Sequence, residues 1–186
     1  MYRTGYEAMA KVLTYPDQEY TAAVRAFREE MPVECSVQAV EFASCIEALS
    51  LQVQQELFTQ TFDLNPMCSL ELGWHLFGEN YERGLLLVRM REELRAAGVP
   101  ERGELPDHLT YALRLLPRIE RERGADFVCA IVLPALMKMW EAMRGKNNPY
   151  EKLLQSLAAL LNLDFPDIPP PETKVELPIL PQEVTL

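Results

Sequence analysis

Residues 126–143 read DFVCAIVLPALMKMWEAM and form the most apolar segment of the chain. Apolar side chains from Phe127 to Met143 nearly encircle a helix drawn through this segment, which is the pattern of a buried central helix. Pro134 is expected to kink the helix, because proline lacks the N–H that bonds to residue i−4. Gly124 is expected to separate it from the helix before it. The segment therefore predicts a helical core.

The segments on both sides also carry apolar residues at helical spacing. Residues 150–161 place leucines on one side of a helix, and residues 109–119 continue the pattern until Pro117, which should bend that helix or end it early. Further helices are expected within residues 6–13, 17–32, 36–49, 50–62 and 79–97. Since no convincing period-two alternation occurs in the first half, the sequence predicts an all-α, single-domain bundle of about seven or eight helices.

Apolar spacing also assigns an inner face to two of these helices. The expected inward residues are Val37, Val40, Phe42, Ile46 and Leu49 in the first of them, and Leu85, Val88, Met90, Leu94 and Ala97 in the second. The second helix carries charged residues on its other face, which we interpret as a solvated surface.

The composition changes at Asp164. Six of the 14 prolines lie between Pro166 and Pro181, with acidic residues among them. This composition is typical of an extended, polyproline-like tail. We therefore expect a helical domain at 1–163 and a proline-rich acidic tail at 164–186, whose apolar residues could lie along the body as a strap.

The formal net charge of −10 argues against a nucleic-acid partner, which requires a basic surface. It is compatible with a cationic partner or simply with solubility. The four cysteines form no CxxC pair and are expected to be reduced and mostly buried. The first residues lack the apolar core of a signal peptide, and no apolar run is long enough to span a bilayer. A cytoplasmic protein is expected.

Residues 104–109, ELPDHL, hold the most informative polar cluster. Pro106 and Asp107 suit the first turn of a helix, where proline loses no hydrogen bond and a carboxylate meets the positive end of the helix dipole. Helix capping does not require Glu104 and His108 at the same place. The cluster is therefore interpreted either as a polar cap or as a binding site.

Catalytic and metal-binding signatures are missing. The only histidines are His75 and His108, and neither has the partners of a hydrolase or the spacing of a zinc site. Residues 78–84 begin and end with glycine but lack the lysine of a phosphate-binding loop. His75 follows Trp74 in an apolar stretch and is interpreted as a packed histidine. These observations favour a binding protein over an enzyme.

Four segments together resemble the NarJ/TorD/DmsD-type assembly chaperones of molybdenum-containing reductases, and most closely the NarJ branch. They are LTYPD at 13–17, LFTQTFD at 57–63, GENYERG at 78–84 and ELPDHL at 104–109. The third departs from the family pattern at Phe77, Asn80 and Glu82. The family-motif positions are Tyr15, Phe58, Asp63, Glu79, Arg83, Gly84 and Pro106.

The resemblance implies an all-helical cytoplasmic chaperone that is not an enzyme and holds no permanent cofactor. Its partner would be the immature catalytic subunit of a molybdenum enzyme, bound through an N-terminal segment or twin-arginine leader before cofactor insertion, membrane attachment or export. A homodimer is compatible with it. The residues expected to bind the client peptide are Glu104, Asp107, His108, Tyr111 and Leu115. A small nucleotide-binding enzyme and an accessory subunit of the mature complex are the alternatives.

Overall fold

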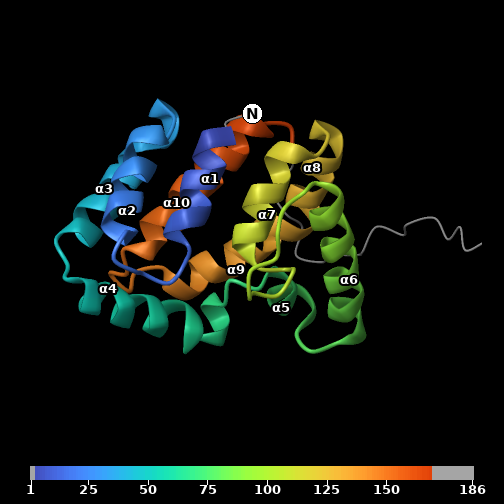
Figure 1. Cartoon of the computed structure of the whole chain (residues 1–186), viewed down its shortest axis with the longest axis horizontal. Coiled ribbons are helices and arrows are strands. Elements are labelled where there is room, and N and C mark those ends of the chain that lie inside the picture. Colours follow the sequence, from blue (N-terminus) through green and yellow to red (C-terminus); the bar gives the residue numbers. More distant parts are fainter. Residues whose placement is uncertain (1–2, 169–186) are drawn as a thin grey trace, which may run out of the picture.

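The computed structural model describes residues 3–168, and this part of the chain consists of helices joined by short turns (Figure 1). The α-helices are Arg3–Val12 (α1), Tyr20–Glu30 (α2), Ser36–Glu47 (α3), Leu51–Phe58 (α4), Leu72–Phe77 (α5), Tyr81–Ala96 (α6), Leu109–Leu115 (α7), Arg121–Phe127 (α8), Leu133–Met143 (α9) and Tyr150–Asp164 (α10). The described residues contain no strand, only an isolated antiparallel bridge between Glu71 and His108. The predicted all-α fold is confirmed, although the helices are divided more finely than expected.

The core joins helices that are distant in the sequence. Helix α1 packs against α2 and α7, and α10 packs against α3 and α9. The ring of Tyr150, at the start of α10, lies 5.4 Å from Phe42, 6.0 Å from Phe58 and 4.7 Å from Phe62, measured between centroids. Its hydroxyl lies 3.0 Å from that of Tyr20. This aromatic cluster fixes the end of α4 to the body of the bundle.

The most apolar segment is helical but not one regular helix. Its residues fall in α8, in a π turn at Val128–Val132 and in α9. The wide turn ends two residues before Pro134, where the missing N–H would break a regular ladder. The predicted separation at Gly124 is wrong: this residue lies inside α8, where a Cβ would stand 3.3 Å from the Phe165 ring.

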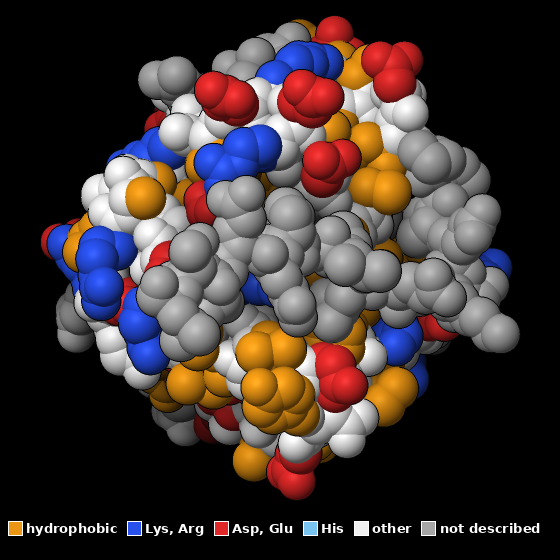
Figure 2. Space-filling view, turned by 90° about the vertical axis from the view of Figure 1, so that its right-hand side faces the viewer, with side chains coloured by type: hydrophobic (Ala, Val, Ile, Leu, Met, Phe, Trp, Pro, Cys, Tyr) orange, Lys and Arg blue, Asp and Glu red, His pale blue; other side chains and the backbone are white. Residues whose placement is uncertain are grey.

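The inner face of α6 was predicted only in part. Met90 and Leu94 are buried as expected, together with Leu86, whereas Leu85 and Val88 are exposed. Figure 2 looks at the end of the molecule where α6 lies and shows apolar side chains among charged ones. Helix α6 therefore leaves part of its apolar surface in solvent.

Helix α3 shows a similar difference. Ala39, Phe42 and Ile46 are buried as its inner side, but Val37 and Val40 are exposed. The buried residues Ala39, Phe42, Ala43 and Ile46 follow the i, i+3, i+4, i+7 spacing of one helix face, and the two valines lie off that face.

Helix α7 begins later than predicted. His108 is the N-cap, so Pro106 and Asp107 precede the helix instead of forming its first turn. Every residue of α7 except Arg114 is buried. The predicted effect of Pro117 is confirmed, because α7 ends at Leu115 and a 3-10 turn, Leu116–Arg118, follows.

Helix α10 extends to Asp164, Phe165 is buried and Ile168 packs partly buried against the core. The division at 163/164 stays a prediction, and of the apolar residues in the proposed strap only Ile168 is among the described residues, since 169–186 lie outside them. None of the helices within 3–168 has the length and apolar character needed to cross a membrane.

Candidate functional site

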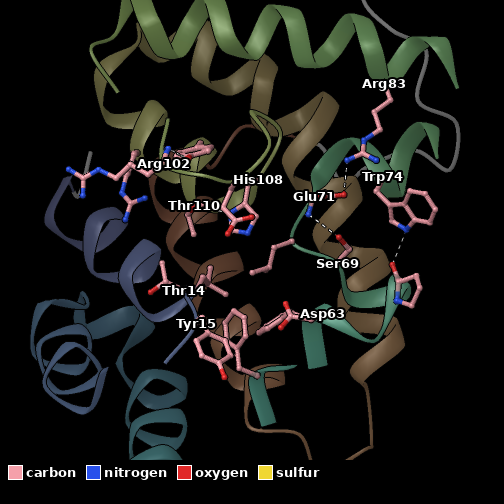
Figure 3. A pocket seen from close by; sticks show the side chains of 18 of the residues that line it. Thr14, Tyr15, Asp63, Ser69, Glu71, Trp74, Arg83, Arg102, His108 and Thr110 are labelled. Carbon is pink, nitrogen blue, oxygen red and sulfur yellow. Dashed lines mark hydrogen bonds and ion pairs between the residues drawn. The ribbon is translucent and has the colours of Figure 1, made fainter. Parts of the chain in front are cut away.

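Eight of the twelve predicted site residues line one cavity of about 990 Å³ (Figure 3). They are Tyr15, Phe58, Asp63, Glu79, Arg83, Glu104, His108 and Tyr111. They come from the end of α1, the α4 region, the loop before α6, α6 itself, the loop 98–108 and α7. Four motifs that are far apart in the sequence therefore meet at one surface.

The ELPDHL segment is held in the wall of this cavity by backbone pairing. The Leu72 N–H donates to the Asp107 carbonyl at 2.9 Å, and the Leu109 N–H donates to the Leu70 carbonyl at 2.7 Å. These bonds form the bridge between Glu71 and His108. They hold His108 in an extended conformation, whereas Pro106 and Asp107 form a turn in which the His108 N–H donates to the Leu105 carbonyl at 2.9 Å, so α7 begins only after His108.

Asp107 does not face the cavity. Its side chain is fully buried, and Oδ2 accepts hydrogen bonds from the Gly73 N–H at 3.2 Å and from Arg83 Nε at 3.1 Å. Arg83 Nη2 also binds Glu71 Oε2 at 2.6 Å. Through these hydrogen bonds, the Asp107 carboxylate joins the loop to α5 and α6. Arg83 and Glu71 are the members of this ion-pair network that reach the cavity.

Gly73 makes that network possible. A Cβ at this position would stand 2.7 Å from Asp107 Oδ2, 3.0 Å from Leu86 Cδ2 and 3.1 Å from Arg83 Cγ. Sequence reasoning missed Gly73, because a glycine inside an apolar helix gives no sign of what approaches it.

His108 presents a neutral ring to the cavity. Its Nδ1 accepts from the Thr110 N–H at 3.4 Å and lies 2.8 Å from Thr110 Oγ1. Burial first, and the nearby charge of Arg114 second, lower the pKa of this histidine to about 4. With Nδ1 as acceptor, the proton of the neutral ring is on Nε2, so His108 can donate one hydrogen bond to a ligand.

The lowered pKa predicts a pH dependence of stability. An unfolded histidine, with a pKa near 6.5, binds more protons than the folded one at any pH between about 4 and 6.5. The contribution of His108 to the free energy of unfolding is therefore fully present above about pH 6.5, and it is lost as the pH falls towards 4. We expect His108 to account for a loss of about 2 kcal/mol in the free energy of unfolding between pH 7 and pH 5.

Urea denaturation at the two pH values measures this loss. His108→Gln should reduce the pH dependence without abolishing it, because burial also lowers the pKa of His75. An unchanged pH dependence in the variant would assign the effect to other groups.

Tyr111 and Leu115 differ in position. The Tyr111 hydroxyl accepts a hydrogen bond from the backbone N–H of Arg102, so it anchors the loop that carries Glu104. Leu115 is buried in the core and does not line the cavity. A client peptide could contact Tyr111 without any movement of α7, but not Leu115.

Of the remaining motif residues, some line the cavity and others do not. Asp63, Glu79 and Glu104 are exposed carboxylates on the cavity with no ion-pair partner among residues 3–168. Gly84 lies exposed on α6 and Pro106 is buried in the loop, and neither lines the cavity.

Several lining residues were not predicted as site residues. Trp74 donates from Nε1 to the Pro66 carbonyl at 3.0 Å, and the Arg83 guanidinium lies 5.9 Å from its ring. Arg102 and Arg114 also line the cavity, and Arg102 lies on the side away from Asp63 (Figure 3). These arginines belong to none of the sequence motifs, so only their position in the structure identifies them as lining residues. His75 is packed as expected, with Nε2 lying 2.6 Å from the Ser69 carbonyl oxygen.

No group of three or more histidine, cysteine or acidic side chains within residues 3–168 is arranged to hold a metal ion. Cys35 and Cys68 are buried, Cys129 is partly buried and Cys45 is exposed, all as free thiols. The lining of the cavity includes carboxylates, arginines, His108 and aromatic side chains.

Comparison with known proteins identifies relatives but no matching family model. The chain is 25% identical over 161 residues to the probable nitrate reductase molybdenum cofactor assembly chaperone NarJ of Bacillus subtilis strain 168, covering 84% of this chain and 87% of that protein. It is 25% identical over 162 residues to the nitrate reductase molybdenum cofactor assembly chaperone NarJ of Escherichia coli K12, covering 83% and 68% respectively. The resemblance to the NarJ branch is confirmed. Both names describe chaperones, in agreement with the expectation that the chain is not an enzyme.

Proposed function

We propose, from this similarity to NarJ assembly chaperones, that the protein assists molybdenum cofactor assembly in a nitrate reductase or a related molybdenum enzyme. It would bind the catalytic subunit before the cofactor is inserted and release it for membrane attachment or export. The observation that supports this most directly is the convergence of eight predicted residues, from separate parts of the chain, on one cavity.

The cavity has the size and chemistry for a peptide segment. Its volume of about 990 Å³ is at the upper end of ordinary ligand pockets. Tyr15 and Phe58, whose rings lie 5.8 Å apart, offer an aromatic surface for apolar side chains. Asp63, Glu79 and Glu104 offer carboxylates for basic ones. An amphipathic segment with basic residues, such as an N-terminal segment or twin-arginine leader, would fit this combination.

The two residues first expected to bind the client would then act differently. His108 would donate from Nε2 to a carbonyl oxygen of the bound segment. Asp107 would act indirectly, because its carboxylate is buried and engaged by Gly73 and Arg83.

A pull-down from cells grown anaerobically, with mass spectrometry of the eluted proteins, tests the function. We expect a molybdenum-enzyme catalytic subunit without its cofactor, in a cytoplasmic fraction. Recovery of the finished, cofactor-loaded complex at fixed stoichiometry would instead identify an accessory subunit. Absence of any reductase, in cells that express one, would contradict the proposal.

The binding site is tested with a labelled peptide from the N-terminus of the subunit recovered. The triple variant Asp63→Asn/Glu79→Gln/Glu104→Gln should bind it about tenfold more weakly or worse, at about 0.5–1 kcal/mol for each exposed charge. The control Glu30→Gln/Glu122→Gln/Asp126→Asn removes three exposed charges outside the cavity and should bind like the wild type. Equal weakening in both triples would mean that net charge, not this cavity, attracts the peptide.

A further inference from the structure

A second cavity, of about 530 Å³, adjoins the first and has the opposite electrical character. Its lining consists of Glu7, Pro100, Arg102, Arg114, Pro117 and Arg118. Arg102 and Arg114 belong to both cavities. Three of the six lining residues are therefore arginines, in a chain whose formal net charge is −10.

The arginines are brought together by two elements. Arg114 lies in the last turn of α7 and Arg118 follows four residues later, in the 3-10 turn that contains Pro117. Arg102 comes from the loop before α7, and its backbone N–H is bonded to the Tyr111 hydroxyl. The fold thus places the three arginines around one space, although the sequence separates Arg102 from the other two.

Their charges are only partly balanced. Arg114 Nε lies 3.3 Å from Glu7 Oε2, the one acidic residue of the lining. Arg102 and Arg118 have no carboxylate partner within residues 3–168, and Glu101 is taken by Arg91 at 3.0 Å. The lining therefore carries three positive charges and one negative charge.

We propose that this cavity binds the phosphate or pyrophosphate group of a small molecule. A dianion would neutralise the two unbalanced charges. The guanidinium group matches tetrahedral oxyanions because it can donate two parallel hydrogen bonds. The volume leaves space for the rest of a small ligand beyond its anionic group. The site is independent of the carboxylates proposed to bind the client.

Isothermal titration of the full-length protein with inorganic pyrophosphate, at constant ionic strength, tests the proposal. We expect saturable binding with one site per chain. Arg102→Gln and Arg118→Gln should each raise the dissociation constant about tenfold, through loss of a charge-assisted contact. Both side chains are exposed and unpaired within 3–168, so melting temperatures close to that of the wild type should accompany the loss.

Arg95→Gln is the matched control, because it removes an exposed, unpaired arginine on α6, away from both cavities. It should bind pyrophosphate like the wild type. Equal weakening by Arg95→Gln, or no saturable binding to the wild type, would overturn the proposal. Tighter binding of hexaglutamate than of pyrophosphate would also overturn it, since the cavity would then select an acidic peptide.

Discussion

Replacing Arg83 by alanine is expected to lower the free energy of unfolding by about 3–5 kcal/mol, which is the usual cost of leaving one member of a buried ion pair without its partner. Asp107 is fully buried, and Arg83 Nε is the only side-chain donor to it within residues 3–168. For a chain of this size the loss corresponds to a decrease of about 6–20 °C in melting temperature.

Thermal unfolding followed by circular dichroism measures this effect. Arg89→Ala is the control, because Arg89 is an exposed arginine of the same helix with no ion pair in the described part of the chain. It should change the melting temperature by only a degree or two. Arg83→Ala/Asp107→Ala should recover part of the loss, since the double variant leaves no uncompensated charge. Similar losses for Arg83→Ala and Arg89→Ala would contradict the assigned role of the buried pair.

Gly73→Ala is expected to be the second most damaging of these changes, at about 1–3 kcal/mol. The added methyl group would stand 2.7 Å from Asp107 Oδ2, closer than any ordinary contact. Asp107 cannot move away without losing its hydrogen bonds to Gly73 and Arg83. The substitution should therefore displace the loop and lower client affinity together with stability.

Gly84→Ala is the natural comparison, because the same substitution is made one helix later with open space around it. No atom lies within 4 Å of a Cβ built on Gly84, and the residue lies inside α6. Alanine should stabilise the protein there by about 0.5–1 kcal/mol. Chemical denaturation of the two variants compares them directly. If both lost stability to the same extent, close packing at Gly73 could not be the cause.

Under the proposed function, one motif would serve both stability and client binding. Within ELPDHL, Asp107 fixes the segment to α5 and α6, whereas Glu104 and His108 face the cavity. Loss of client binding in an Asp107 variant would therefore not prove contact between Asp107 and the client. The stability of each variant has to be measured beside its affinity.

The helical fold was predictable because its signals are local. Apolar spacing, proline positions and caps such as Ser50, whose side chain accepts from the Val53 N–H, depend on neighbours a few residues away. The choice of buried face in α6 was not predictable. Four apolar residues follow one another at 85–88, so apolar spacing is compatible with more than one buried face of this helix. Only the packing of α6 against α5 and α7 determined that Leu86 is buried, whereas Leu85 and Val88 are exposed.

The candidate site shows the same difference between residues with a local signal in the sequence and residues placed by distant contacts. Seven of the residues that line the cavity were predicted from the four motifs, because those residue types are distinctive in sequence order, and Tyr111 was predicted from its place shortly after ELPDHL. Gly73, Trp74 and the arginines of the second cavity were missed, since each depends on a segment far away in the chain. The sequence determined that the chain forms helices and carries the ELPDHL cluster. The tertiary structure decided that Asp107 is buried and His108 faces the cavity, because long-range backbone pairing with residues 70–72 orients the two adjacent side chains differently.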